Sequence, residues 1–328
     1  MGDAATKTTT PEPTPSFYVA THATDQFAMF QTPAELIAQT KHSRVFKSYS
    51  ALFGRFVAIK IIDKSSIPAA LVEKFLPREL DITQKVDHLN VVKCLFVGIP
   101  HPTKVVIISE FCDGGTLLKY VLDRNGLDDF EAARLFRQLM EGIQYLHKVL
   151  GVAHRDVKLE NILLTSNGLL KLADFGFARE ISGSQKSTSY CGTRPYSAPQ
   201  LVDHIPYLPF AADWFSCGIA LYTMIAGNWP YTPQDKIRYP LCFHPKIGNL
   251  AQILIGQLLE FDETKRAGYY ECLDSEWLRF YTGSIPAPMK QPMARPAVTV
   301  QNVSQTHPPT SRTQYLESAY YPTDHRIK

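Results

Sequence analysis

Two short motifs at a fixed separation constrain the fold of this chain more than any other feature of its sequence. The first is the ten-residue run His154–Leu163, and the second is Asp174-Phe175-Gly176, which follows a turn and a strand-like run. Asp156 in the first motif precedes Asn161 by five residues and Asp174 by eighteen. All three side chains carry oxygen, the ligand atom that hard cations such as magnesium favour.

The chemistry that suits these oxygens is phosphoryl transfer, which needs an acceptor hydroxyl held in line and cations that neutralise developing phosphate charge. The two motifs, in this order and spacing, resemble those of the protein-kinase family. The resemblance implies that Asp156 accepts the hydroxyl proton and that Asn161 and Asp174 are the magnesium ligands. It therefore implies ATP and Mg²⁺ as cofactors.

An upstream lysine motif fits the same interpretation. Val57-Ala58-Ile59-Lys60 lies in the apolar, β-branched run 56–62, which predicts a buried strand. Alone it would indicate an ordinary strand, but the downstream motifs supply the context that it needs. By the resemblance, Lys60 reaches the nucleotide phosphates and Glu79, on a helix, holds it in place. The implied catalytic residues are Asp156, Lys158, Lys60 and Glu79.

Hydrophobic patterns divide the folded region into two parts. The first is dominated by predicted strands with one helix among them, and the second, after the turn at 113–115, by helices. A capped helix start is predicted at 128–131, and the nearly all-apolar segment Trp214–Ile225 predicts a buried helix in the larger part. In the first part, the predicted strands are Val57–Ile62, Val91–Val97 and Val105–Phe111, and the predicted helix is Glu73–Val86.

This arrangement resembles the bilobal protein-kinase fold, an α+β fold. The small lobe is mainly antiparallel β with one key helix, and the larger lobe is mainly helical. We expect a protein kinase domain over 25–282, flanked by disordered tails at 1–24 and 283–328, where Pro and polar residues lack apolar periodicity. Three short stretches (73–79, 174–178 and 205–209) resemble the testis-specific serine kinases of the calmodulin-dependent-kinase group.

The nucleotide-binding loop departs most from the family pattern. Counting back from Val45, the three family glycines fall on Ala38, Thr40 and Ser43. Glycine lets a backbone approach phosphates and adopt unusual dihedral angles, so we expect side chains here to loosen phosphate contact or stiffen the loop. Two outcomes stay open: a hairpin that still folds over ATP, or weakened nucleotide binding. The resemblance implies nucleotide contacts from Ile37, Ala38, Val45, Ala58, Lys60, Glu110, Cys112 and Leu163.

Two smaller departures concern the interior. Gln200 stands where the family has a glutamate, so Arg266 is expected to gain at best a hydrogen bond from it instead of an ion pair. Thr83 takes a position where the family packs an apolar residue towards Phe175, which favours a mobile helix. By contrast, Asp213 matches the family residue that braces the catalytic loop.

Residues near the expected acceptor site indicate the substrate class. Lys158 and Thr193 form the pair that serine/threonine kinases use beside the acceptor hydroxyl. Glu160 matches an acidic position that contacts arginine upstream of the acceptor, whereas Thr116 replaces a second such acid. The resemblance therefore implies protein substrates with Ser or Thr acceptors, and a preference for basic sequences is half supported.

The activation segment is expected over 174–200. Arg155 precedes the catalytic aspartate and is a ready partner for a phosphate, since phosphorylation orders such loops through arginine pairs. Ser189 aligns best with the family phosphosite and Thr188 is the alternative. An activating kinase acting on either residue is an expected partner.

Bulk properties narrow the alternatives. A net charge of +3 over 328 residues, without a basic stripe, gives no case for nucleic-acid binding. We expect no transmembrane segment and no signal peptide, and hence a cytoplasmic location with possible access to the nucleus. The six cysteines lack zinc-ligand spacing.

Two functions remain. The first is a serine/threonine protein kinase that transfers the γ-phosphate of ATP. The second is a weakly active or inactive nucleotide-binding scaffold with the same fold, because fold alone does not fix function. Intact Lys60, Glu79, Asp156, Asn161 and Asp174 favour the enzyme, and the altered loop favours the scaffold.

Overall fold

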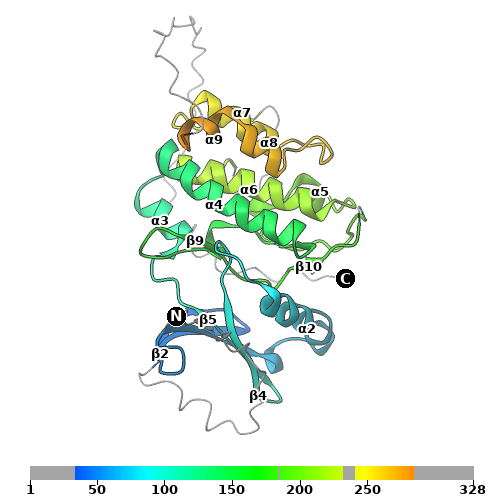
Figure 1. Cartoon of the computed structure of the whole chain (residues 1–328). Helices are drawn as coiled ribbons and strands as arrows, with labels where there is room; N and C mark the ends of the chain where they lie inside the picture. Colours follow the sequence, from blue (N-terminus) through cyan, green and yellow to red (C-terminus); the bar gives the residue numbers. More distant parts are fainter. Residues whose placement is uncertain (1–33, 184, 232–240, 284–328) are drawn as a thin grey trace, which may run out of the picture.

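Two lobes of different composition form the part of the chain that the computed structural model describes, residues 34–183, 185–231 and 241–283 (Figure 1). The predicted N-terminal tail, and the predicted C-terminal tail beyond Gly283, lie outside these residues. The smaller lobe contains a sheet and one long helix, and the larger lobe is mainly helical, as expected.

Five antiparallel strands form the sheet of the smaller lobe, in the order β1-β2-β3-β5-β4. The predicted strand at 57–62 is present as β3, whereas the predicted strand at 91–97 begins later, because Val91 makes only an isolated bridge to Leu172. The strands are β1 (Glu35–Gln39), β2 (Ser43–Ser50), β3 (Arg55–Asp63), β4 (Cys94–His101) and β5 (Lys104–Glu110).

Cross-strand pairs show which residues share a face of this sheet, since directly opposed residues point to the same side. Ala38 pairs with Val45, Val45 with Lys60, and Lys60 with Ile107. Ile107 packs with Leu76 of helix α2 (Ala69–Lys85), so this helix covers the same face. The fold thereby places α2 beside Lys60.

Helix α2 begins four residues before the predicted start and ends one residue before the predicted end. Pro68 precedes it, and Pro77 lies inside it without breaking it. Because proline has no N–H, one backbone hydrogen bond of the helix is absent there. Packing of Leu76 against the sheet contributes to holding the helix despite this loss.

The larger lobe is built around two long helices, α4 (Asp129–Lys148) and α6 (Pro209–Ala226). The Asp128 side chain accepts a hydrogen bond from the Glu131 amide at 2.8 Å, the cap that the sequence predicts. Helix α6 is buried over most of its length and ends at Gly227, whose φ of +76° requires glycine-like freedom. The other helices are α3 (Leu117–Asp123), α5 (Pro199–Val202), α7 (Asn249–Leu258), α8 (Tyr269–Asp274) and α9 (Glu276–Tyr281).

Short strands and turns at the junction of the lobes carry the sequence motifs. They are β6 (Gly115–Thr116), β7 (Val152–Ala153), η3 (Leu159–Asn161), β8 (Ile162–Leu164), β9 (Leu170–Leu172), β10 (Arg179–Glu180) and η4 (Arg194–Tyr196). Strands β6, β8 and β9 form one small sheet, and β7 pairs with β10.

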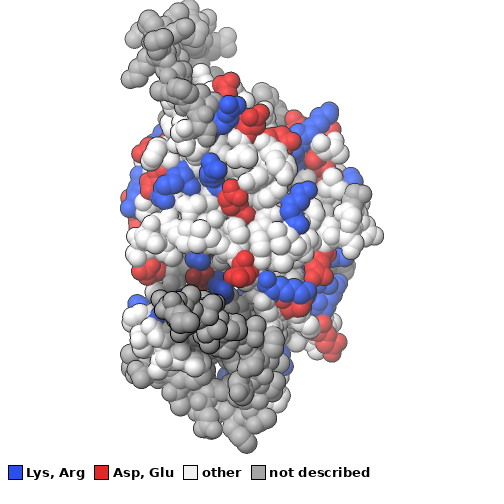
Figure 2. Space-filling model, viewed as in Figure 1, with Lys and Arg blue, Asp and Glu red and all other residues white. Residues whose placement is uncertain are grey.

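The surface of the larger lobe carries both signs of charge. Figure 2 shows Lys and Arg interspersed with Asp and Glu across the face drawn. Among the described residues, no helix has both the length and the apolar character needed to cross a bilayer.

Candidate active site

Asp213 of helix α6 holds the catalytic loop, residues 154–163, in place through hydrogen bonds. Its side chain is 1% exposed, and its two oxygens accept hydrogen bonds from the backbone amides of His154 at 2.8 Å and Arg155 at 2.7 Å. The His147 ring lies 2.8 Å from the same carboxylate. Arg155 has a φ of +67°, an uncommon conformation that these bonds help to hold.

The Asp156 carboxylate is bonded at both oxygens. Thr193 donates to Oδ1 at 2.7 Å, while Lys158 Nζ and Asn161 Nδ2 reach Oδ2 at 2.8 and 2.9 Å. Lys158 Nζ also donates to the Thr193 hydroxyl at 2.7 Å. Burial opposes the charge on Lys158, but the carboxylates of Asp156, Glu160 and Asp174 together raise the pKa of the lysine. Lys158 and Thr193, the pair expected from the sequence, thus both contact the Asp156 carboxylate.

Lys60 connects the two lobes. Its Nζ lies 2.9 Å from Glu79 Oε1 on helix α2 and 3.0 Å from Asp174 Oδ1 in the larger lobe. Burial opposes its charge, but Asp174 and Glu79 together raise its pKa. The positive charge of Lys60 in turn lowers the pKa of Asp174 to about 2, so that this carboxylate is ionised at neutral pH. Lys60 thus bridges Glu79 of helix α2 and Asp174 of the Asp-Phe-Gly motif.

The oxygens of Asn161 and Asp174 suit a hard cation. Asn161 Nδ2 donates to the Asp156 backbone oxygen and carboxylate, each at 2.9 Å, and this assigns the amide so that its oxygen points away from Asp156. The Asp174 side chain is 47% exposed and ionised. An amide oxygen and a carboxylate match the donor set that Mg²⁺ prefers.

The expected nucleotide contacts come from several elements. Ala38, Val45 and Lys60 form one row across the sheet, and Ala58 lies two residues along β3 on the same face. Ile37 sits at an irregularity of β1 and is 42% exposed. Two further contacts come from the link between the lobes and from the larger lobe: Cys112, which is buried, and Leu163, which pairs with Thr116.

Glu110 behaves differently from the other expected contacts. Its carboxylate accepts from Lys171 Nζ at 2.6 Å and from the Lys93 amide at 2.7 Å. Both bonds end on Oε1, so this carboxylate already has partners within the protein. The pairing with Lys171 of β9 was not foreseen, although a lysine inside the apolar run 169–172 was a signal that it needed a buried partner.

Lys60, Glu79 and Asp174 meet at the junction of the two lobes, and the comparisons with known proteins decide the family. The family described as Protein kinase domain matches residues 33–278. The chain belongs to the protein kinase family.

Individual relatives refine this assignment to serine/threonine kinases. Testis-specific serine/threonine-protein kinase 3 of Homo sapiens is 35% identical over 254 residues, covering 74% of this chain and 93% of that protein. Testis-specific serine/threonine-protein kinase 2 of Mus musculus is 34% identical over 258 residues, covering 74% and 72%. CBL-interacting protein kinase 8 of Oryza sativa subsp. japonica is 35% identical over 238 residues, covering 69% and 52%. The chain is a protein serine/threonine kinase.

The activation segment of this kinase is tied to the catalytic loop. Arg155 Nη2 donates to the Ser189 carbonyl at 2.8 Å and to its hydroxyl at 3.0 Å. Gly192 has a φ of +111°, and a Cβ there would lie 2.7 Å from the Arg155 carbonyl oxygen, so only glycine permits this approach. Further along, Ser187 and Tyr207 exchange two backbone hydrogen bonds.

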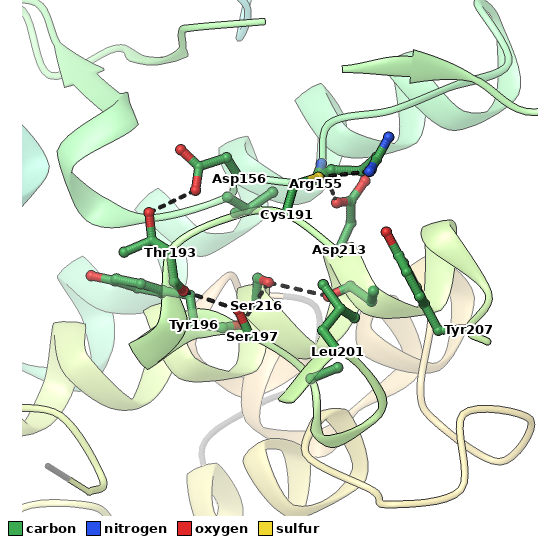
Figure 3. A pocket seen from close by; sticks show the side chains of 13 residues that line it. Arg155, Asp156, Cys191, Thr193, Tyr196, Ser197, Leu201, Tyr207, Asp213 and Ser216 are labelled. Carbon is green, nitrogen blue, oxygen red and sulfur yellow. Dashed lines mark hydrogen bonds between the residues drawn. The ribbon is translucent and has the colours of Figure 1, made fainter. Parts of the chain in front are cut away.

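A small pocket of the kinase lies where the activation segment meets the catalytic loop and helix α6 (Figure 3). Asp156 and Thr193 point toward one another at one side of it, joined by their hydrogen bond. Below them, Ser216 of α6 donates to the Tyr196 carbonyl at 2.8 Å. Helix α6 therefore supports the catalytic loop through Asp213 and the activation segment through Ser216.

The substitution at Gln200 is accommodated by the main chain. Arg266 donates to Gln200 Oε1 at 3.2 Å, and to the carbonyls of Glu260 at 3.0 Å and Ala211 at 2.9 Å. Its guanidinium also lies 5.0 Å from the Phe215 ring centroid. Carbonyl dipoles thus replace much of what a glutamate would provide, and the arginine is better compensated than the sequence suggested.

Glu160 and Thr116 occupy the expected substrate side of the kinase. Glu160 Oε2 is buried, without a hydrogen-bond partner among the described residues, and burial raises the pKa of this carboxyl. Thr116 caps helix α3 by accepting from the Lys119 amide at 3.3 Å. Thr83, the second interior departure, is buried on α2.

Proposed function

We propose that this serine/threonine kinase transfers the γ-phosphate of ATP to Ser or Thr hydroxyls of protein substrates, with Asp156 as the catalytic base. The observation that carries the proposal is the bonding of Asp156, whose two carboxylate oxygens are held by Thr193, Lys158 and Asn161. A base must be fixed within reach of the proton that it accepts. These three partners, two of which are also bonded to each other, provide that fixation.

Each neighbouring residue has a distinct task in this proposal. Lys60, held by Glu79, binds the nucleotide phosphates, and Lys158 stabilises the negative charge that develops beside the acceptor. Asn161 and Asp174 would hold the magnesium ions. When bound, these ions neutralise charge on the phosphates.

Substrate choice follows from the residues around Asp156. The Lys158–Thr193 pair supports a Ser or Thr acceptor. The buried Oε2 of Glu160, which has no partner among residues 34–183, 185–231 and 241–283, supports a basic residue on the substrate. A cation from the substrate would satisfy an oxygen that burial otherwise penalises.

Activation is proposed to involve Ser189. Its hydroxyl lies 3.0 Å from Arg155 Nη2, and the Nε of that arginine is buried without a partner in the described part of the chain. A phosphate on Ser189 would accept from such a donor. The alternative residue, Thr188, is exposed.

A nucleotide-binding scaffold with little catalysis is the second candidate. It is supported by the β1–β2 hairpin, where Ala38, Thr40 and Ser43 replace glycines.

Thermal denaturation with increasing Mg-ATP, run beside phosphate transfer to a basic Ser-containing peptide, separates the two candidates. The kinase proposal expects both a rise in Tm and transfer. Asp156→Asn should keep the rise and lose the transfer. A rise without transfer in the parent protein, before and after treatment with an activating kinase, would favour the scaffold, and the absence of both would contradict each candidate.

A further inference from the structure

The turn between β1 and β2 is closed by its own side chains. Thr40 Oγ1 accepts hydrogen bonds from the amides of Ser43 at 3.0 Å and His42 at 3.3 Å. The same hydroxyl lies 2.9 Å from Ser43 Oγ, which supplies a partner for its hydrogen. The Thr40 amide donates to the Ser43 carbonyl at 2.8 Å. One threonine therefore joins both sides of the turn.

The same turn is anchored from outside. The His42 carbonyl accepts from the Asp63 amide at 2.9 Å, and His42 Nδ1 lies 3.0 Å from the Ser66 hydroxyl. Ser66 donates its single hydroxyl hydrogen to the Asp63 carbonyl at 2.7 Å, so Nδ1 of His42 carries the hydrogen in their bond. These contacts attach the turn to η2 (Lys64–Ser66), the connection that leads to α2.

None of the residues in this turn needs glycine for its backbone conformation. Thr40, Lys41, His42 and Ser43 all have negative φ values, since the non-glycine residues with positive φ in the described ranges lie elsewhere. The unusual dihedral angles that glycine permits are therefore not used in this turn. What the side chains change is the availability of backbone amides.

Phosphate-binding loops work through such amides, which point their N–H groups at the phosphate oxygens. In this chain, Thr40 already holds two of them. A phosphate could reach the amides of His42 and Ser43 only by displacing the Thr40 hydroxyl. The occupied amide of Ser43 lies on β2 two residues before Val45, which belongs to the row Ala38–Val45–Lys60 that is proposed to contact the nucleotide.

We propose that Thr40 is a specificity-determining residue that competes internally with the nucleotide phosphates for the amides of His42 and Ser43. The inference rests on the proposed nucleotide-binding function. It predicts that the phosphates of ATP contribute less to binding affinity than they would if the amides of His42 and Ser43 were not already bonded to Thr40. Removing the hydroxyl while keeping the side-chain shape should release the amides to the ligand.

The test compares Thr40→Val with the parent protein by calorimetric titration with Mg-ATP and with adenosine. A neutral hydrogen bond is worth about 0.5–1.5 kcal/mol net, so Thr40→Val should bind Mg-ATP roughly 3- to 10-fold more tightly. Affinity for adenosine, which has no phosphate, should stay unchanged. Thr40→Ser keeps the hydroxyl and should behave like the parent.

Thr165→Val is the matched control. The Thr165 hydroxyl accepts from the Leu169 amide at 3.0 Å in the β8–β9 turn, the same kind of closure in the other lobe. Its loss should leave both affinities unchanged. Thr40→Ala repeats the measurement if valine lowers the Tm of the free protein.

Unchanged or weaker Mg-ATP binding by Thr40→Val would overturn the inference, while binding of both ligands by the parent would leave the proposed function intact. An equal gain for ATP and adenosine would also overturn it, since the effect would not involve phosphate. If neither the parent nor the variants bound either ligand, both the nucleotide-binding function and the inference would fail.

Discussion

The catalytic loop and the β1–β2 hairpin belong to the same site but are held in opposite ways. Asp156 and Asp213 are 6% and 1% exposed. Asp156 is held by its neighbours Lys158 and Asn161 and by Thr193 of the activation segment, while Asp213 reaches His154 and Arg155 from helix α6. All five residues of β1 are exposed, and Thr40 closes the turn after β1 with bonds to His42 and Ser43, while His42 attaches the turn to Asp63 and Ser66. The catalytic loop is thus buried and held by helix α6 and the activation segment, whereas the hairpin is exposed and is held mainly by its own turn and the strand beside it.

This difference bears on the largest departure from the family, the hairpin, although Gln200 and Thr83 are buried departures. A change at Asp156, Asn161 or Asp213 would leave several buried polar groups without partners, at about 1–3 kcal/mol each. A change in the exposed hairpin alters only local bonds. The kinase therefore keeps its catalytic loop intact while the hairpin has lost all three glycines.

The strongest test of the comparison is Asp156→Asn. Because asparagine cannot accept the proton, phosphate transfer should fall by about 10²–10⁴-fold while ATP binding stays close to that of the parent. Initial rates on a Ser-containing peptide and an ATP titration measure the two effects. Asp123→Asn, which breaks only the exposed pair with Lys119, is the control and should change neither. Transfer at the parental rate would show that Asp156 is not the base.

Lys60→Met tests the contact between the lobes. Loss of its charge should reduce turnover roughly 10²–10³-fold, and Glu79→Ala should cause a smaller loss because the lysine remains but is less well held. Lys47→Met is the control, since Lys47 lies between Glu35 and the Phe56 and Phe111 rings. Unaltered turnover in Lys60→Met would point instead to Lys41 or Lys47 as the phosphate-binding lysine.

The triple variant with glycine at Ala38, Thr40 and Ser43 restores the family's glycine pattern in the β1–β2 hairpin. ATP binding should tighten by roughly 3- to 10-fold and turnover should rise, because the amides become available. The free protein should lose about 1–3 kcal/mol of stability, since three glycines make the unfolded chain more flexible. Nucleotide titration and melting without nucleotide measure these effects separately.

The control is the double variant Ser166→Gly with Asn167→Gly, two exposed residues of the β8–β9 turn. It adds flexibility to the chain away from the hairpin, so it should lower Tm without changing ATP affinity. Tighter ATP binding without any transfer would favour the scaffold. No change in either quantity would mean that the hairpin side chains point away from the phosphates.

Glu160→Gln has the smallest expected effect. It tests whether the buried carboxylate of Glu160, beside the catalytic loop, lowers the stability of the folded protein. Burial raises the pKa of Glu160 above its ordinary value of 4.5, so the folded state is penalised at pH values where the carboxyl is ionised. The substitution removes the charge, and we expect a gain of about 1 kcal/mol at pH 7, roughly 2–4 °C in Tm.

The gain should shrink as the pH falls through the raised pKa of the folded state, and it should disappear below 4.5, where the glutamate becomes protonated in both states. Transfer to a basic peptide should weaken in the same variant. Glu73→Gln, on the exposed side of α2, is the control and should show no gain. A Tm difference that does not vary with pH would contradict the proposed buried charge.

The sequence by itself predicted the family and two of its main elements. The motifs at 154–163 and 174–176 carried the resemblance to protein kinases, and apolar runs predicted β3 and the buried helix α6. These predictions worked because hydrophobic periodicity and fixed motif lengths are local properties of a chain.

Tertiary structure alone decided how polar groups found partners across elements. Glu110 meets Lys171 of another strand, and Arg266 replaces a missing glutamate with carbonyls from three separate residues. Carbonyls are present at every residue, so the sequence carries no sign of which ones will lie within reach. Only the packing of helices and strands brings a particular carbonyl or carboxylate to within about 3 Å of a buried cation.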